Sequence, residues 1–451
     1  MREERDSLGE MVLADEAYFG IGTARLAMAL PAIGPSYPME IVEGIVQIRA
    51  AQAVDFGRSG IWAESIGFAV QKAARRILEK RFPLAPQVQI CPLHGGGARG
   101  IVANIDEVLA NLALEEMGAP KGEYHLVAPV IRNDFGLDSV ATYMAAVHIA
   151  LLYELKRIEE GISAVEQLLR DKEQLWQHNR FLMRMNFRDI AILKLGDIFG
   201  QYAEGLLRSR QQLDWLKSRL LPCWQGRVEA LLPLREITCL ELMVCQKKID
   251  FPLNIDLYAC VSAQLKALAI HVLQFCNSMR ELLGGSGQLE CDRLRAGQPL
   301  NPTELELLVP DTVNQTVFSI IGCEAAITAA LGASPAGGAA AMSFFTTQLM
   351  NSAQMTTYCL AALQEHFLCK LTHCEDVSNK LLENTPLQAE RLIPILGYDR
   401  AVQVARIATL TEKPVWTVVV KMKLMTAEQA NDLFAVTIDI TTENIAAEND
   451  S

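Results

Sequence analysis

A single apolar stripe of unusual length runs through the middle of the chain. Its side chains recur every three or four residues, the spacing of one helix face; they are Met144, Val147, Leu151, Leu155, Ile158, Ile162, Val165 and Leu169. Asp138 or Ser139 offers a cap for the start of this helix. A stripe of roughly seven turns cannot be buried within a small domain, so the helix must pack against partners of similar length.

Further long helical patterns follow. They cover residues 198–220, 257–283, 313–331 and 342–371. Several of these segments are apolar nearly all round, which predicts burial against other subunits as well as within one chain. Strand-like sequence is scarce, and we expect only two minor hairpin segments, over residues 415–420 and 436–440.

Clusters of glycine and proline divide the 451 residues into three expected parts. Residues 1–138 form a mixed, mostly helical N-terminal domain. Residues 139–385 form a central domain of long helices, and residues 386–451 form a small helical C-terminal domain. The predicted fold class is therefore mainly α.

Charge and composition argue against several functional classes. The chain has 53 acidic and 41 basic residues and a net charge of −12, which disfavours binding to nucleic acid or to an anionic membrane. The 11 cysteines include no CxxC pair and are expected to be free thiols in a reducing cytosol. The best candidate for a membrane span, residues 322–345, is mostly Ala and Gly and contains Glu324 and Pro335. We expect a cytoplasmic protein without a membrane anchor.

Three segments, in the right order, resemble the aspartase branch of the aspartase/fumarase superfamily. They are ERDSLGEMVLADEAYFGIGTAR from Glu4, HGGGARGIVANIDEVLAN from His94 and LIPILGYDRAVQVARIA from Leu392. The resemblance covers nearly the whole chain. It implies a three-domain fold whose central bundle of long helices tetramerises into a 20-helix core, with each active site assembled from three subunits.

The family's chemistry is the anti elimination of ammonia or water from a dicarboxylate. A loop serine removes the proton, and a lysine and an asparagine stabilise the negative charge that develops. The family's loop reads Gly-Ser-Ser-x-Met-Pro-x-Lys-x-Asn, whereas this chain reads GQPLNPTELE from Gly297. The serine, lysine and asparagine positions are therefore Gln298, Glu304 and Glu306. A carboxamide cannot act as the base, and two carboxylates would repel a dicarboxylate substrate.

The family's other substrate-binding positions are substituted as well. Arg99 stands where the family has the Thr of a Thr-Ser pair, while Asn104 is retained. The family's Ser-Thr-Asn-Asp reads Ile-Arg-Asn-Asp at residues 131–134. Asn186 follows Met185 where the family has a threonine followed by histidine or glutamine. The resemblance thus implies a preserved scaffold with a changed site.

A ligand cleft lined by charged groups is the functional prediction from these residues. The predicted acid–base groups are Asp106, Glu304 and Glu306, and the predicted ligand-binding residues are His94, Arg99, Asn104, Arg132, Asn133, Asp134, Asn186, Arg188 and Gln298. The structural alternatives are an inherited turn at residues 94–97, helix capping by Asn133 and Asp134, and salt bridges that close an unused cleft.

No cofactor and no metal are expected. His366, Cys369 and His373 could share one helix face, but a structural zinc site needs four convergent ligands. His148 lies beside the long apolar stripe and is expected to be a hydrogen-bonded core histidine.

Two main hypotheses for the function follow. In the first, the chain is a repurposed enzyme that binds a small polar or anionic ligand other than aspartate or fumarate in the inter-subunit cleft. In the second, it is a catalytically inactive aspartase paralogue that serves as a structural or regulatory subunit beside an active relative. Residual ammonia-lyase activity is a third alternative. A homotetramer is the expected assembly, with no nucleic-acid or membrane partner.

Overall fold

The computed structural model describes residues 1–30, 33–129, 138–186, 188–245, 255–291, 307–333 and 341–434. The chain forms two compact units. Unit 1 comprises residues 1–160, 209–269 and 316–359, and unit 2 comprises residues 161–208, 270–315 and 360–451. The expected division into three sequence-contiguous domains stays a prediction.

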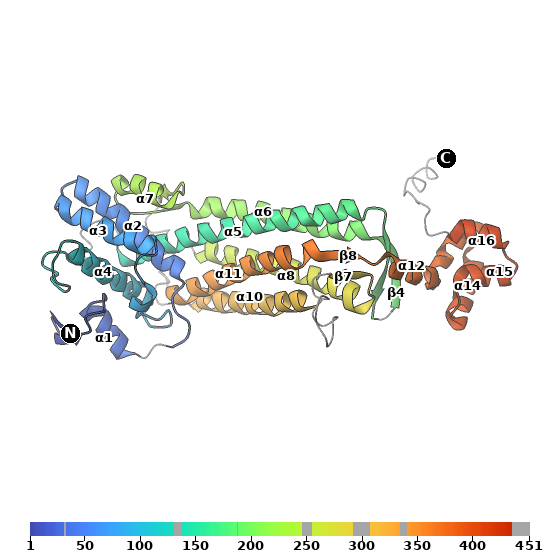
Figure 1. Ribbon diagram of the computed structural model, residues 1–451, viewed down its shortest axis with the longest axis horizontal. Helices are drawn as coiled ribbons and strands as arrows, with labels where there is room; N and C mark the ends of the chain where they lie inside the picture. Colours follow the sequence, from blue (N-terminus) through green and yellow to red (C-terminus); the bar gives the residue numbers. More distant parts are fainter. Residues whose placement is uncertain are drawn as a thin grey trace. The chain divides into compact units, whose positions relative to one another are not determined.

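The long helices confirm the periodicity in the sequence (Figure 1). They are α5 (Ser139–Leu175), α6 (Leu195–Leu220), α8 (Ile255–Arg280), α10 (Leu308–Ala333) and α11 (Met342–His366). The carboxylate of Asp138 caps α5 by accepting a hydrogen bond of 2.7 Å from the Ala141 N–H. Every member of the predicted stripe is at most 2% exposed, so hydrophobic burial stabilises this helix along its length.

Unit 1 adds shorter elements around its segments of the long helices. An antiparallel hairpin of β1 (Arg2–Asp6) and β2 (Gly9–Leu13) precedes α1 (Ile21–Ala29), α2 (Met39–Arg58), α3 (Glu64–Leu78) and α4 (Gly97–Glu116). The small helix α7 (Leu231–Thr238) packs on α2, and β5 (Pro222–Trp224) pairs in parallel with β6 (Met243–Val244). Helix α4 is almost wholly buried from Ile101 to Leu114.

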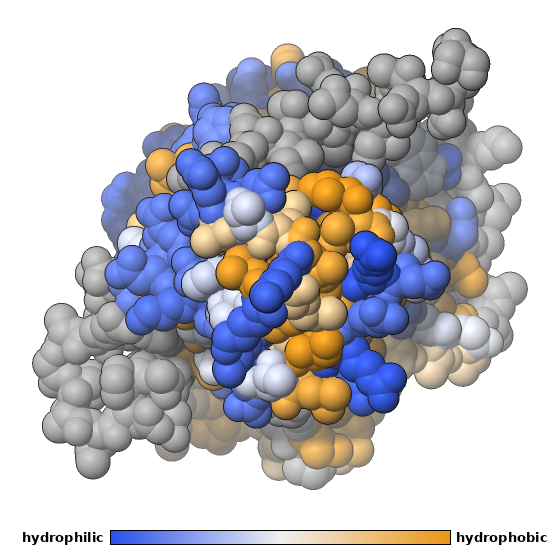
Figure 2. Space-filling view, turned by 90° about the vertical axis from the view of Figure 1, so that its right-hand side faces the viewer, coloured by the Kyte–Doolittle hydropathy of each residue, from blue (hydrophilic) through white to orange (hydrophobic). Residues whose placement is uncertain are grey.

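Unit 2 contains two antiparallel strand pairs and a helical C-terminal part. Strand β3 (Arg180–Met185) pairs with β4 (Arg188–Lys194), and β7 (Leu289–Cys291) pairs with β8 (Leu371–His373). The C-terminal helices are α12 (Glu375–Asn384), α13 (Ile393–Leu396), α14 (Tyr398–Thr411), α15 (Val415–Lys421) and α16 (Ala427–Phe434). The last of these helices enclose a core of their own. Figure 2 shows apolar surface gathered among hydrophilic side chains on one face of the molecule.

Two secondary-structure predictions are wrong. Residues 415–420 form helix α15 instead of a strand, because Val415, Val418 and Val419 follow the helical spacing and are buried in the C-terminal core. Helix α11 ends at His366, and a 3₁₀ turn and strand β8 follow it. The expected helix face that His366 would share with Cys369 and His373 therefore does not exist. The predicted strand over residues 436–440 lies outside the described residues.

His148 is a hydrogen-bonded core histidine, as predicted. It is 2% exposed, and its Nδ1 and Nε2 lie 2.8 Å from the Leu220 carbonyl and 2.7 Å from the Tyr258 hydroxyl. Burial lowers the pKa of His148 to about 4, and the bond to Leu220 opposes this shift only partly. The native fold therefore holds this imidazole neutral at pH values where an unfolded chain protonates it.

We expect this histidine to make stability depend on pH. The unfolded chain takes up the proton near pH 6.5, so the contribution of His148 is complete above that pH. It is lost as the pH falls towards 4, by about 3 kcal/mol in total. His148→Gln keeps hydrogen-bonding capacity without titrating and should remove this part of the slope in chemical denaturation across pH 4 to 7. His178→Gln, at an exposed site, should leave the slope unchanged; an unchanged slope in His148→Gln would contradict the assignment.

Two helices combine high hydropathy with incomplete burial. The helical segment Ile255–Gly285 and α10 are long and apolar enough to cross a membrane by length and composition alone, yet only 44% and 22% of their most apolar windows are buried. Such windows also occur in core helices of soluble proteins, so they are weak support for a membrane span. The outward face of α10 is largely uncharged: the small residues Ser319, Gly322, Ala325, Ala329 and Gly332 are all exposed, and so is Phe318.

Candidate functional site

A pocket in unit 1 lies at the start of α4. Its volume is about 370 Å³, and it is lined by Leu26, Ala29, Leu30, Ile90, His94, Gly95, Gly96, Gly97, Arg99, Gly100 and Ala103. The Gly97 N–H donates to the His94 carbonyl at 3.0 Å and closes a tight turn. Gly96 has a φ of +73°, a left-handed conformation that favours glycine. The predicted turn at residues 94–97 is therefore present, and the structure brings the predicted His94 and Arg99 into the same pocket.

The pocket is electropositive. A helix N-terminus carries a partial positive charge and presents N–H groups to anions, and Arg99 on the first turn of α4 adds a full charge. Arg99 is exposed, and no carboxylate among the described residues lies within ion-pair distance of it. The described lining residues include no acidic side chain. This arrangement can bind an anion without displacing an existing ion pair.

Buried polar side chains pack against the glycine turn. A Cβ added to Gly97 would lie 2.8 Å from the Tyr37 hydroxyl and 2.9 Å from Ser343 Oγ, so the helix can begin in this position only with glycine. Ser343 Oγ donates to the Pro92 carbonyl at 2.8 Å. Burial raises the pKa of Tyr37 far above its usual value. Sequence reasoning identified the glycines but not these supporting residues, which lie far apart in the chain.

Two buried glutamates position α1, which forms the apolar wall of the pocket. Glu107 accepts hydrogen bonds from the N–H groups of Gly20 at 2.8 Å, Gly22 at 3.0 Å and Thr23 at 3.2 Å, and Glu4 accepts from Ile21 at 2.8 Å. Burial raises the pKa of Glu107, against the lowering effect of its bonds to Thr23 and Gly20. These carboxylates satisfy the first N–H groups of α1. Both carboxylates therefore serve to hold the N-terminal end of α1 in place.

Asn104 and Asp106 point away from the pocket. Asn104 is fully buried, and its amide accepts from the Gln89 N–H at 2.9 Å and donates to the Gln87 carbonyl at 3.0 Å. Asp106 is 3% exposed and forms a bidentate ion pair with Arg49, at 2.7 and 2.9 Å. In this single chain both groups stabilise the scaffold, and their predicted ligand-binding and acid–base roles stay predictions.

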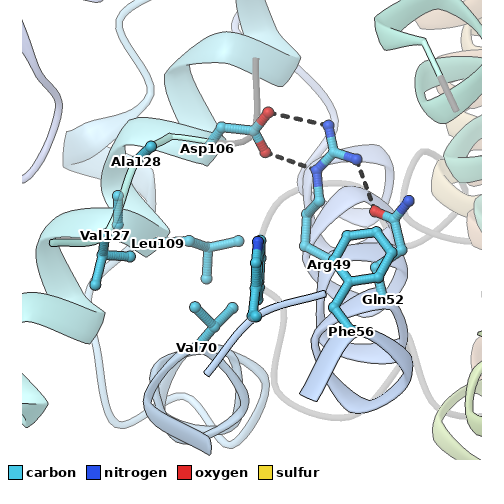
Figure 3. Close-up of a pocket in the computed structure, with 10 residues that line it drawn as sticks. Arg49, Gln52, Phe56, Val70, Asp106, Leu109, Val127 and Ala128 are labelled. Atoms are coloured by element: carbon cyan, nitrogen blue, oxygen red, sulfur yellow. Dashed lines mark hydrogen bonds and ion pairs between the residues drawn. The ribbon is translucent and has the colours of Figure 1, made fainter. Parts of the chain in front are cut away.

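Figure 3 shows the surroundings of this ion pair. The Arg49 guanidinium also donates to the side-chain amide oxygen (Oε1) of Gln52 at 2.7 Å, and Phe56, Val70 and Leu109 line a cavity of about 10 Å³ beside the pair. A cavity of that size has room for about one water molecule. Burial raises the pKa of Asp106, and the charge and hydrogen bonds of Arg49 act against this shift. A cavity with room for only about one water molecule is too small for a substrate.

Asn186 and Arg188 lie in unit 2, at the turn that joins β3 to β4. Asn186 has a φ of +51°, which asparagine tolerates better than most residues, and both side chains are exposed. Arg184 on the same hairpin pairs with Asp189 at 3.1 Å. The remaining predicted site residues, Arg132, Asn133, Asp134, Gln298, Glu304 and Glu306, lie outside the described residues.

Within the described part of the chain, no group of three or more His, Cys, Asp or Glu side chains could hold a metal ion. His373 instead bonds through Nδ1 to Asn179 at 3.1 Å and through Nε2 to Ser378 at 2.8 Å. Both of its ring nitrogens therefore have polar partners inside unit 2.

Known proteins similar to this chain are lyases. An aspartate ammonia-lyase of Helicobacter pylori is 25% identical, over 96% of this chain and 97% of its own length, and one from a Bacillus species is 24% identical over 96% of each. The crystal structure of a Brucella melitensis fumarate lyase:delta crystallin superposes with a TM-score of 0.88 at 21% identity, covering 97% of this chain and all of that one. A class II fumarase from Schistosoma mansoni gives a TM-score of 0.83 at 15% identity over 97% and 98% of the two chains. No protein-family model matches.

Proposed function

Since the chain is a member of the aspartase/fumarase superfamily, we propose that it is a lyase-fold enzyme repurposed for an anionic ligand other than aspartate or fumarate. The ligand binds in the cleft at the start of α4. Any activity is of the lyase type, an elimination or addition at a C–N or C–O bond. The protein acts in the cytoplasm.

The observation that carries this proposal is the pocket at the start of α4. It keeps an open volume of about 370 Å³ and an arginine without an acidic partner among the described residues. A cation beside a helix N-terminus is repelled by the partial positive charge there, so it does not stabilise the fold. A bound anion would offset this repulsion. The changes at Gln298, Glu304 and Glu306 remove the proton acceptor and the cation that aspartate deamination requires, which favours a different substrate.

Assembly into a homotetramer completes the proposed site. The outward face of α10 combines small uncharged residues with an exposed aromatic ring at Phe318, and a Cβ added to Gly322 or Gly332 would meet no atom within 4 Å. Lys266 of α8 pairs with Glu324 of α10 at 2.7 Å, so the charge of Glu324 is already neutralised within the single chain. Small residues permit close approach of another helix, and we propose that further copies of this chain cover the face.

Restoring the two lost catalytic groups should not restore aspartate deamination. In the double variant Gln298→Ser/Glu304→Lys, the position of the family's substrate-binding threonine is still Arg99. We expect fumarate release from L-aspartate, followed by ultraviolet absorbance, to stay at the background of the unmodified protein. Release well above that background would show that the rest of the pocket suits aspartate, and would favour the residual ammonia-lyase alternative.

Removal of the charged groups tests the repurposed cleft itself. Once a ligand is found on the purified protein, Arg99→Ala should weaken its binding by about tenfold for the loss of one charged contact. Glu304→Ala should lower its turnover by at least about tenfold, because it removes a proposed acid–base group. Arg75→Ala, at an exposed site on α3, is the matched control. If both cleft variants bind and turn over the ligand as the unmodified protein does, the proposal is wrong.

The second candidate is an inactive subunit that assembles with an active aspartase-like relative. The family's serine, lysine and asparagine are all replaced, by Gln298, Glu304 and Glu306. Their simultaneous replacement favours this candidate. In that case the purified assembly contains two kinds of chain, and the Arg99 and Glu304 variants change neither ligand content nor the activity of the partner.

A further inference from the structure

The pocket at the start of α4 combines one cationic end with an apolar wall. Five of its lining residues are aliphatic: Leu26, Ala29, Leu30, Ile90 and Ala103. In the single chain Leu26 and Leu30 are 48% and 49% exposed, so they offer apolar surface that a ligand can cover. Burying such surface is favourable in proportion to its area.

The cationic end offers one charge and free backbone donors. Among the described lining residues, Arg99 carries the only full charge. The N–H groups of Gly95 and Gly96 make no hydrogen bond within the described residues, and a Cβ added at either position would meet nothing within 4 Å. A ligand can therefore approach this backbone closely, as anions do at helix N-termini.

Gly100 brings the apolar wall against α4. A Cβ at this position would lie 3.3 Å from Ile90 and 3.7 Å from Leu26, which is already tight for a single added carbon. The hydroxyl of a serine or threonine would therefore crowd the pocket here. At this position the chain presents aliphatic groups to the ligand instead of a second polar anchor.

We propose that the pocket binds a monoanion with an apolar body, such as a carboxylate on a short alkyl or aryl chain, in preference to a dicarboxylate. The carboxylate lies at Arg99 and the glycine turn, and the apolar body covers Leu26, Leu30 and Ile90. A second carboxylate beside these aliphatic groups would lose its hydration without gaining a cation or a donor from the described lining residues. This inference rests on the proposed function, because it names the ligand class of the same cleft.

Three six-carbon probes of similar length test the inference on the full chain. Hexanoate has one carboxylate, adipate has two, and hexanamide has none. Ligand-observed NMR titrations should show hexanoate binding at least about tenfold more tightly than either of the others, since each lacks one of the two matched features. Arg99→Gln should reduce hexanoate binding to the level of hexanamide. Leu26→Asn should weaken it as well, and its half-exposed position makes a folding defect unexpected.

Matched controls are available outside the pocket. Arg75→Gln on α3 and Leu232→Asn, at a leucine that is 60% exposed, should leave hexanoate binding unchanged. Adipate binding as tightly as hexanoate would overturn the inference but leave the proposed function standing. Hexanoate binding that ignores Arg99→Gln, or no binding of any probe, would also overturn it. The proposed function itself fails by a different result, namely the absence of any ligand or turnover that depends on Arg99 and Glu304.

Discussion

Replacing Asp106 with alanine lowers the free energy of unfolding by about 3–5 kcal/mol, the cost of leaving one member of a buried ion pair without its partner. Arg49 is 3% exposed, so its guanidinium stays largely desolvated when the carboxylate is removed. Chemical denaturation of the purified variant measures this loss directly. The effect is among the largest expected for a single substitution in this chain.

Two further variants separate the ion pair from a general loss of packing. Arg49→Met combined with Asp106→Leu removes both charges, and we expect it to recover at least half of the lost stability. Glu10→Ala breaks an exposed ion pair in which the side chains of Arg5 and Glu10 are 79% and 56% accessible. This change should lower the free energy of unfolding by under about 1 kcal/mol. If Asp106→Ala were as mild as Glu10→Ala, the buried pair would not stabilise unit 1 as described.

Placing a charge on the outward face of α10 should dissociate the proposed homotetramer. Ala329→Glu points into open space in the single chain but into apolar surroundings once other copies cover this face. A buried, unpaired carboxylate costs several kcal/mol, and a symmetric tetramer contains it four times. We expect analytical ultracentrifugation to show a tetramer for the unmodified protein and smaller species for the variant.

Ala63→Glu, at an exposed position before α3, is the control and should remain tetrameric. Circular dichroism should be the same for both variants, because Ala329 is exposed in the single chain. A tetramer that survives Ala329→Glu would place the subunit contacts on other surfaces.

Local periodicity predicted the long helices because each buries a continuous stripe, and it predicted the buried role of His148 from its place beside that stripe. It failed for residues 415–420, where three consecutive valines from Val418 suggest a strand. There the C-terminal core favours a helix that buries one side of the segment. β-Branched residues tolerate either conformation, and tertiary contacts decide between them.

The site was predictable only in part. The glycines and Arg99 are adjacent in sequence, so the turn and its cation could be identified together. The ion-pair partner of Asp106 could not be predicted, because Arg49 is 57 residues away and nothing in the local pattern links the two. The same holds for Ser343, which reaches the turn from α11. Long-range contacts of this kind decide whether a polar residue binds a ligand or holds the scaffold.

Native mass spectrometry of the protein purified from its own host tests the central claim most directly, because it reports subunit composition and retained small molecules together. The repurposed-enzyme account predicts a homotetramer that carries a small anionic ligand, and it predicts that Arg99→Gln loses that ligand while remaining tetrameric. A mixed assembly with a relative that keeps the serine loop, and with no ligand bound to this chain, would contradict the account and identify the chain as an inactive subunit.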